Sequence, residues 1–173
     1  MIDDVTVQFP HLNAAPSLQP LAGDDERAVR ARAEDQLADL AHVGRELCGL
    51  LGMTSAWGAS RWVAGPTRDL LIPTYRITVQ GDAPDEATTT RIVRRLTLQG
   101  WHGEVSAYAP ELRLDASRAS VSMRLVAAQR RVRLTVTGQP LRLHRELVKS
   151  MLAGVYEDDA RASKGRDIPG APV

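Results

Sequence analysis

The stretch ASVSMRLVAAQRRVRLTVTG at residues 119–138 decides the fold class of this chain. Apolar and polar residues alternate on both sides of its middle, which is the period of a half-buried strand. Ala128, Gln129 and Arg130 join the two runs and allow a tight hairpin turn. The apolar members are Ala119, Val121, Met123, Leu125, Val132, Leu134 and Val136. The other face, which we expect to contact water, carries Ser120, Ser122, Arg124, Arg131, Arg133 and Thr135.

Three segments around this hairpin show the period of an amphipathic helix. The first begins at the cap Asp24 and ends at Gly52, the second begins at Asp82 or Asp85 and ends at Gly100, and the third follows Pro140. The first stripe is Val29, Ala33, Leu37, Leu40, Gly44, Leu47 and Leu51. The second is Thr89, Ile92, Val93 and Leu96, and the third is His144, Leu147, Val148, Met151, Leu152 and Val155.

Further strands are predicted at 70–79, where Pro73 favours an edge or a bulge, and at 105–108 and 112–114. The order of helices and strands, with consecutive strands late in the chain, predicts an α+β fold. We expect an antiparallel sheet of four to five strands with the helices packed on one face. Trp101, directly after the glycine that ends the second helix, is expected in the core.

The chain is expected to hold one domain at 24–156, after an extended segment or linker at 1–23 and before a disordered tail at 157–173. Alternation of Val5, Val7 and Phe9 allows an edge strand within the first segment. Residues 52–68 are predicted to form a glycine-rich loop.

Composition excludes several classes of protein. The net charge is +1, from 22 basic and 21 acidic residues, so no global field draws the chain to nucleic acid or to an anionic membrane. Cys48 is the only cysteine, which excludes an internal disulfide and a multi-cysteine metal site. No stretch approaches the roughly 20 apolar residues of a membrane span. No signal peptide is present as the sequence is written, although a chain that had lost an anchor would look the same.

No catalytic residue, metal ligand or cofactor is predicted. The four histidines, His11, His42, His102 and His144, lie far apart and lack a ligand pair at metal spacing. Cys48 neighbours Leu47 and Leu51 on the apolar stripe, where a cysteine is usually a small buried side chain. Serine-nucleophile and phosphate-binding motifs are absent.

Two groups of residues are predicted to contact a partner. Trp57 and Trp62 lie in the predicted loop at 52–68, where exposed tryptophans mark binding sites. Arg124, Arg131 and Arg133 lie on the outer face of the hairpin, either simply solvated or facing an acidic protein surface. Nucleic acid is not expected, because this face lacks interleaved aromatic residues unless Tyr108 contributes.

The run RIVRRLTLQGW at 91–101, followed by alternating strands through Val136, resembles the middle of small actinobacterial cell-envelope lipoproteins. Those proteins have a helix that closes in Gly-Trp ahead of an antiparallel sheet. The resemblance covers about a third of the chain. No lipobox cysteine is present, and Cys48 lies too deep to serve as one. The resemblance implies an exported, non-enzymatic domain that has lost its anchor, with residues 3–23 as the tether.

The leading hypothesis is therefore a non-catalytic binding or assembly module that contacts a protein partner, tethered at the cell envelope if an anchor was removed and cytoplasmic otherwise. The first alternative is a structural subunit of a larger assembly, such as a phage or a secretion apparatus. The second is an enzyme or small-ligand protein with an unrecognised site between the sheet and the Trp57 loop. The sequence does not predict an oligomeric state.

Overall fold

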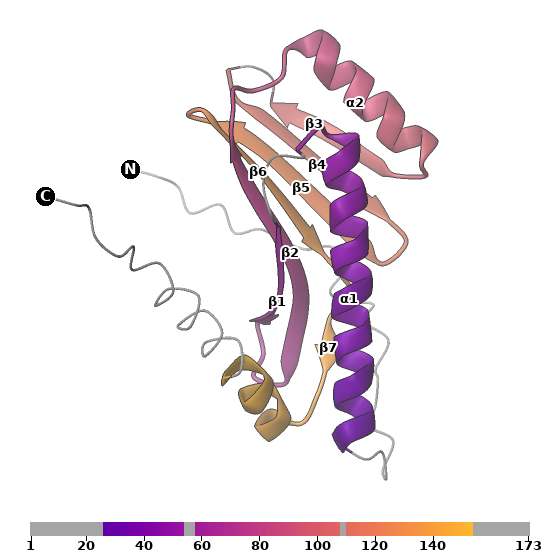
Figure 1. The fold of residues 1–173 in the computed structure, drawn as a ribbon, viewed down its shortest axis with the longest axis vertical. Coiled ribbons are helices and arrows are strands. Elements are labelled where there is room, and N and C mark those ends of the chain that lie inside the picture. Colours follow the sequence, from indigo (N-terminus) through magenta and orange to yellow (C-terminus); the bar gives the residue numbers. More distant parts are fainter. Residues whose placement is uncertain (1–25, 54–57, 108–109, 154–173) are drawn as a thin grey trace, which may run out of the picture.

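The computed structural model describes residues 26–53, 58–107 and 110–153 (Figure 1). Its elements alternate between helices and strands and then continue as consecutive strands. They are α1 (Glu26–Leu50), β1 (Ala59–Ala64), β2 (Leu70–Gln80), α2 (Glu86–Leu98), β3 (His102–Ala107), β4 (Leu112–Arg118), β5 (Val121–Ala128), β6 (Arg131–Thr137) and β7 (Leu141–Arg142). A final helix covers residues 145–153. Four of the predicted features lie outside the described residues: the strand at 5–9, the cap Asp24, Trp57 and the tail at 157–173.

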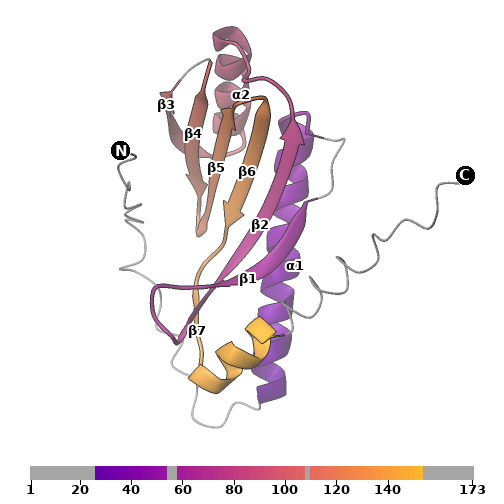
Figure 2. The same cartoon turned by 90° about the vertical axis from the view of Figure 1, so that its left-hand side faces the viewer.

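The strands form one antiparallel sheet in the order β1-β2-β6-β5-β4-β3, and β7 pairs with the lower end of β2. α1 and α2 cover the same face of this sheet (Figure 2). The predicted α+β class and the one-sided packing of these helices are therefore confirmed. The described sheet has seven strands, however, rather than four to five.

The two additional strands, β1 and β7, come from segments whose local pattern is too weak to predict them, and β4 is longer than predicted. β1 lies in the segment 52–68 that we expected to be a loop, and its register places Trp62 opposite Pro73. β4 runs to Arg118, so Ala119 belongs to the β4–β5 turn, with φ 52°, and not to the strand that follows. Pairing with neighbouring strands, which distant residues provide, stabilises these short segments.

The predicted hairpin at the centre of the sheet is confirmed. Ala128 pairs with Arg131, so Gln129 and Arg130 alone make the turn. Both have positive φ, 51° and 60°, as a two-residue turn that follows the strand twist requires.

The core lies between the sheet and the helices in two clusters. The larger one joins the C-terminal half of α1 and the stripe of α2 to the inner sides of β2, β4, β5 and β6. The smaller one joins Ala33 of α1 to Trp62, Leu71 and Leu141, and to the final helix through Met151 and its neighbours. The predicted helix stripes thus face these clusters, and the stripe of α1 contributes to both. The prediction of His144 in the third stripe is wrong, because His144 is exposed and precedes the final helix, and Val155 lies outside the described residues.

The end of α2 positions Trp101 as predicted. Asp85 caps the first turn by accepting a hydrogen bond from the backbone N–H of Thr88. Gly100 then adopts φ +79°, which turns the chain back so that the Trp101 N–H bonds the Leu96 carbonyl at 3.0 Å. The Trp101 side chain is 2% exposed and belongs to the larger cluster.

None of the helices that the structure describes combines the length and apolar character needed to cross a membrane.

Candidate functional site

The face of the sheet that turns away from α1 and α2 carries rows of polar side chains. Cross-strand register defines these rows, because residues directly opposite one another on neighbouring strands share a face. One row runs across five strands through Arg76, Thr135, Arg124, Asp115 and Glu104. The next holds Thr78, Arg133, Val126 and Arg113, and a third holds Gln80, Arg131 and Ala128. We call Arg76, Arg113, Arg124, Arg131 and Arg133 the arginine face.

Two of these arginines share one carboxylate. Asp115 on β4 accepts a hydrogen bond from Nε of Arg113 at 3.1 Å and another from Nε of Arg124 at 2.5 Å. The Arg124 and Asp115 side chains are 34% and 32% exposed, so the pair is only partly open to water. Arg124 lies on the predicted face, but its guanidinium forms an ion pair with Asp115 on the neighbouring strand.

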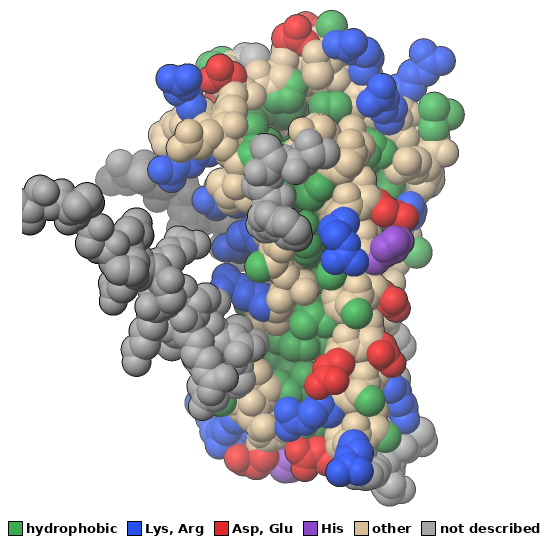
Figure 3. Space-filling view, viewed as in Figure 1, with side chains coloured by type: hydrophobic (Ala, Val, Ile, Leu, Met, Phe, Trp, Pro, Cys, Tyr) green, Lys and Arg blue, Asp and Glu red, His purple; other side chains and the backbone are tan. Residues whose placement is uncertain are grey.

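The other three arginines have a different environment. Arg76, Arg131 and Arg133 are exposed, and none of them forms an ion pair with a residue that the structure describes. Arg133 lies opposite Thr78, and Arg76 opposite Thr135, so Arg76 and Arg133 are diagonal neighbours on the same face of two paired strands. Basic side chains gather along the left-hand side of the molecule in Figure 3, which is the side of the sheet away from α1. The arginine face therefore presents net positive charge on a hydroxyl-rich surface.

The prediction of Trp62 as an exposed loop residue is wrong. Trp62 lies within β1 and is 5% exposed, because its ring packs with Ala33 and Leu71 in the smaller core cluster. The Trp62 ring therefore packs in the core, and the exposure on which the predicted partner contact depended is absent. Its companion in that prediction, Trp57, lies outside the described residues, so a contact there stays a prediction.

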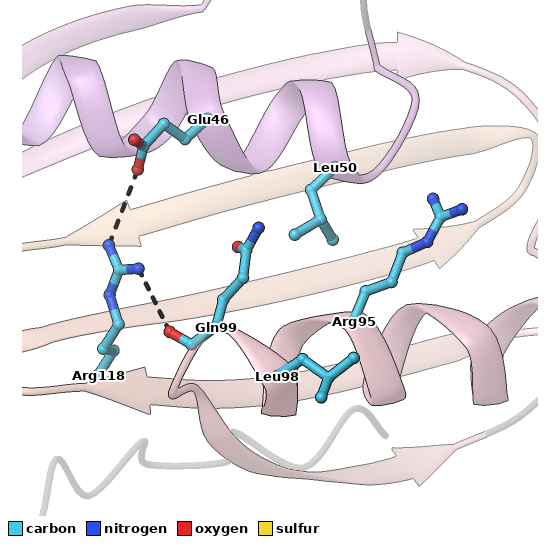
Figure 4. Close-up of a pocket in the computed structure, with 6 residues that line it drawn as sticks. All are labelled: Glu46, Leu50, Arg95, Leu98, Gln99 and Arg118. Atoms are coloured by element: carbon cyan, nitrogen blue, oxygen red, sulfur yellow. Dashed lines mark hydrogen bonds and ion pairs between the residues drawn. The ribbon is translucent and has the colours of Figure 1, made fainter.

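The structure also shows a groove between α1 and α2 that the sequence does not reveal (Figure 4). It measures about 800 Å³ and is lined by Glu46, Leu50, Arg95, Leu98, Gln99 and Arg118. Arg118 closes one end: it donates to the Gln99 carbonyl at 3.5 Å and lies 3.8 Å from Glu46. Its guanidinium also stacks 4.9 Å from the centre of the Trp101 ring. Leu98 is 78% exposed, an unusual value for a large apolar side chain.

Cys48 is buried within the fold, as expected from its place on the apolar stripe. Its Sγ lies 3.7 Å from the hydroxyl of Tyr75 on β2. Burial raises the pKa of the Cys48 thiol, an effect that the hydrogen bond with Tyr75 only partly opposes. Burial and the contact with Cys48 likewise raise the pKa of Tyr75 to about 12. A buried thiol with a raised pKa is a poor nucleophile, because the reactive form is the thiolate.

These two raised pKa values predict an alkaline loss of stability. Above about pH 9, Cys48 and Tyr75 release protons in the unfolded chain but retain them in the folded protein. This release lowers the free energy of the unfolded state relative to that of the native state. The free energy of unfolding should fall by up to about 1.4 kcal/mol per pH unit for each such proton. Urea unfolding at pH 8, 9.5 and 10.5 measures this, and Tyr75→Phe should reduce the slope. An unchanged slope in that variant would contradict the assignment.

The histidines do not assemble with other ligands in the part of the chain that the structure describes. His42 lies on the surface of α1 with Nε2 3.3 Å from Glu46. His102 and His144 are exposed at separate places, the start of β3 and the segment after β7. No group of three or more His, Cys, Asp or Glu side chains among the described residues could hold a metal ion. The prediction that the chain uses no metal or cofactor stays a prediction.

Comparison with known proteins adds one structural likeness. No family model matches the chain, and no curated protein matches its sequence. Among solved structures, the chain is similar to that of the candidate lipoprotein LppA from Mycobacterium tuberculosis, with 14% sequence identity and a TM-score of 0.40. The similarity covers 72% of this chain and 82% of LppA.

Proposed function

We propose that the protein is a non-catalytic binding module whose arginine face contacts an acidic surface of a protein partner. The observation that carries the proposal is the group Arg76, Arg131 and Arg133, which projects from two paired strands without an ion pair to any described residue. Exposed guanidinium groups bind carboxylates in a planar, bidentate way, which suits an acidic protein surface. Cys48 supports a non-catalytic role, since its thiol is buried and its pKa is raised.

A partner other than a second copy fits this face better. Two copies stacked through the arginine face would bring the same unpaired arginines together, and like charges at a contact are unfavourable. The location we propose is the cell envelope. That part of the proposal rests on the resemblance of residues 91–136 to envelope lipoproteins.

Charge reversal tests the proposed contact. The probe is fluorescein-labelled poly-L-glutamate, and fluorescence anisotropy at low salt measures its Kd. We expect Arg131→Glu with Arg133→Glu to weaken binding at least about tenfold, which corresponds to about 1.4 kcal/mol. We also expect binding by the parent to weaken steeply as salt is added, because the attraction is between exposed charges.

A matched control separates the effect of the arginine face on binding from the effect of net charge. Arg68→Glu with Arg94→Glu makes the same change in net charge at two exposed residues, one in the β1–β2 connection and one on α2. This control should bind like the parent. Equal weakening in both double variants, or tighter binding of the parent to an oligothymidylate of equal charge, would refute an acidic protein partner.

A further inference from the structure

The two outer strands of the sheet differ in how well their edges are protected. β3 carries a register shift between Val105 and Ala107 and the exposed acid Glu104, and such bulges and charges discourage pairing with another strand. β1 pairs with β2 in an unbroken register from Ala59 to Ala64. No strand that the structure describes pairs with the outer edge of β1. β1 is therefore the less protected of the two outer strands of the described sheet, and we call its outer side the open edge.

An apolar strip flanks this open edge on the side of the helices. Leu37 and Ala41 of α1 are half-buried against the two core clusters, one turn apart on the helix. Leu37 packs against the cluster that contains Trp62 of β1, and Ala41 packs against the cluster that contains Tyr75 of β2, so this row of α1 faces β1 and β2. Figure 3 shows hydrophobic side chains along the hollow beside α1. A strand added to β1 would lay every second side chain on this strip.

The opposite side of the same edge is basic. Arg61 of β1 faces away from the helices opposite Thr74, and Arg76 lies opposite Ala59. Val63, on the same side of β1, is one of two large apolar side chains exposed in the described part of the chain. The edge thus suits a strand whose inner side chains are aliphatic and whose outer side chains are polar and include an acid.

We propose that residues 4–9 of this same chain, DVTVQF, pair with the outer edge of β1 as a further strand of the sheet. Val5, Val7 and Phe9 would lie on the strip of Leu37 and Ala41, while Asp4, Thr6 and Gln8 share the face of Arg61 and Arg76. An acid at residue 4 would be repelled at the β3 edge by Glu104 and attracted at β1.

The connecting segment is long enough for this pairing within one chain. Ala33 of α1 and Trp62 of β1 meet in one core cluster, and Glu26 lies about 10 Å further along the helix. The 16 residues from Pro10 to Asp25 can span up to about 50 Å. This inference concerns a different surface from the arginine face and does not depend on the proposed function.

Amide hydrogen exchange of the full-length protein, followed by NMR, tests the pairing. The readout is the set of β1 amides, within Ala59–Ala64, that do not bond to β2. We expect Val5→Asp with Val7→Asp to speed their exchange at least about tenfold, because an amide in a ladder exchanges only when the strand opens. The control, Thr6→Asp with Gln8→Asp, adds the same charge on the other side of the segment and should preserve their protection. Amides of β5 and β6 should exchange alike in all three proteins.

Each other outcome overturns the proposal. Fast exchange of these β1 amides in the parent would show an open edge, and slow exchange retained in Val5→Asp with Val7→Asp would show that another segment covers it. Equal loss of amide protection in both double variants would show that the alternation of side chains in residues 4–9 does not decide the pairing. Protection that appears only with a dimer in light scattering would assign the strand to a second copy.

Discussion

Replacing Trp101 by alanine is expected to lower the free energy of unfolding by about 3–5 kcal/mol. The side chain is 2% exposed and belongs to the larger core cluster, so its loss would leave a cavity that the sheet and α2 cannot close. The same change removes the aromatic surface on which Arg118 stacks at 4.9 Å. Arg118 would then close the groove between α1 and α2 through Glu46 and Gln99 alone.

Urea unfolding followed by circular dichroism measures the change for Trp101→Ala, and Leu98→Ala is the matched control. Leu98 lies three residues before Trp101 in the chain and lines the same groove, but it is 78% exposed. Its truncation should change the free energy of unfolding by no more than about 0.5 kcal/mol. Similar losses in the two variants would mean that Trp101 does not fill the core in the way its burial indicates.

Periodicity predicted most of this architecture because each long element buries one continuous stripe. The stripe of α1 and the alternation of β5 and β6 are repeated over many residues, so a single irregular position does not hide them. Gly100 and Trp101 likewise followed from a local rule, since a glycine with positive φ ends a helix and returns the next residue to it.

The parts that could not be predicted depend on contacts between distant residues. β1 is six residues long between glycines, and it is a strand because β2 pairs with it and α1 packs on Trp62. The groove between α1 and α2 is formed by side chains from three separate elements, which no local pattern brings together.

The arginine face was predicted in outline but not in its pairing. Alternation placed Arg124, Arg131 and Arg133 on one side of the hairpin, and the register confirms that shared side. The sequence could not show that Asp115 lies directly opposite Arg124, because this pairing is set by the β4–β5 turn at Ala119. The distinction between a satisfied Arg124 and the unpaired Arg131 and Arg133 therefore needed the structure.

Gly44 and Gly49 of α1 should respond in opposite directions to alanine. A Cβ at residue 44 would overlap the ring of Tyr75, whereas a Cβ at residue 49 would meet no atom within 4 Å. Alanine is the better helix former by about 1 kcal/mol, so Gly49→Ala should raise the free energy of unfolding by up to that amount. Gly44→Ala should lower it by about 1–3 kcal/mol, since overpacking outweighs the helical gain.

The Tyr75 ring has little room to relieve this overlap. Its hydroxyl end lies against Gly58 so closely that a Cβ there would also overlap it, and the same hydroxyl contacts Cys48. A ring pressed by alanine at 44 must therefore move β2 or the start of β1 away from α1. Thermal unfolding and urea unfolding of the two variants measure the difference. If Gly44→Ala proves as stable as Gly49→Ala, the Tyr75 ring does not pack closely against the backbone of α1 at Gly44. The larger core cluster would then be less tightly packed around Tyr75 than its burial indicates.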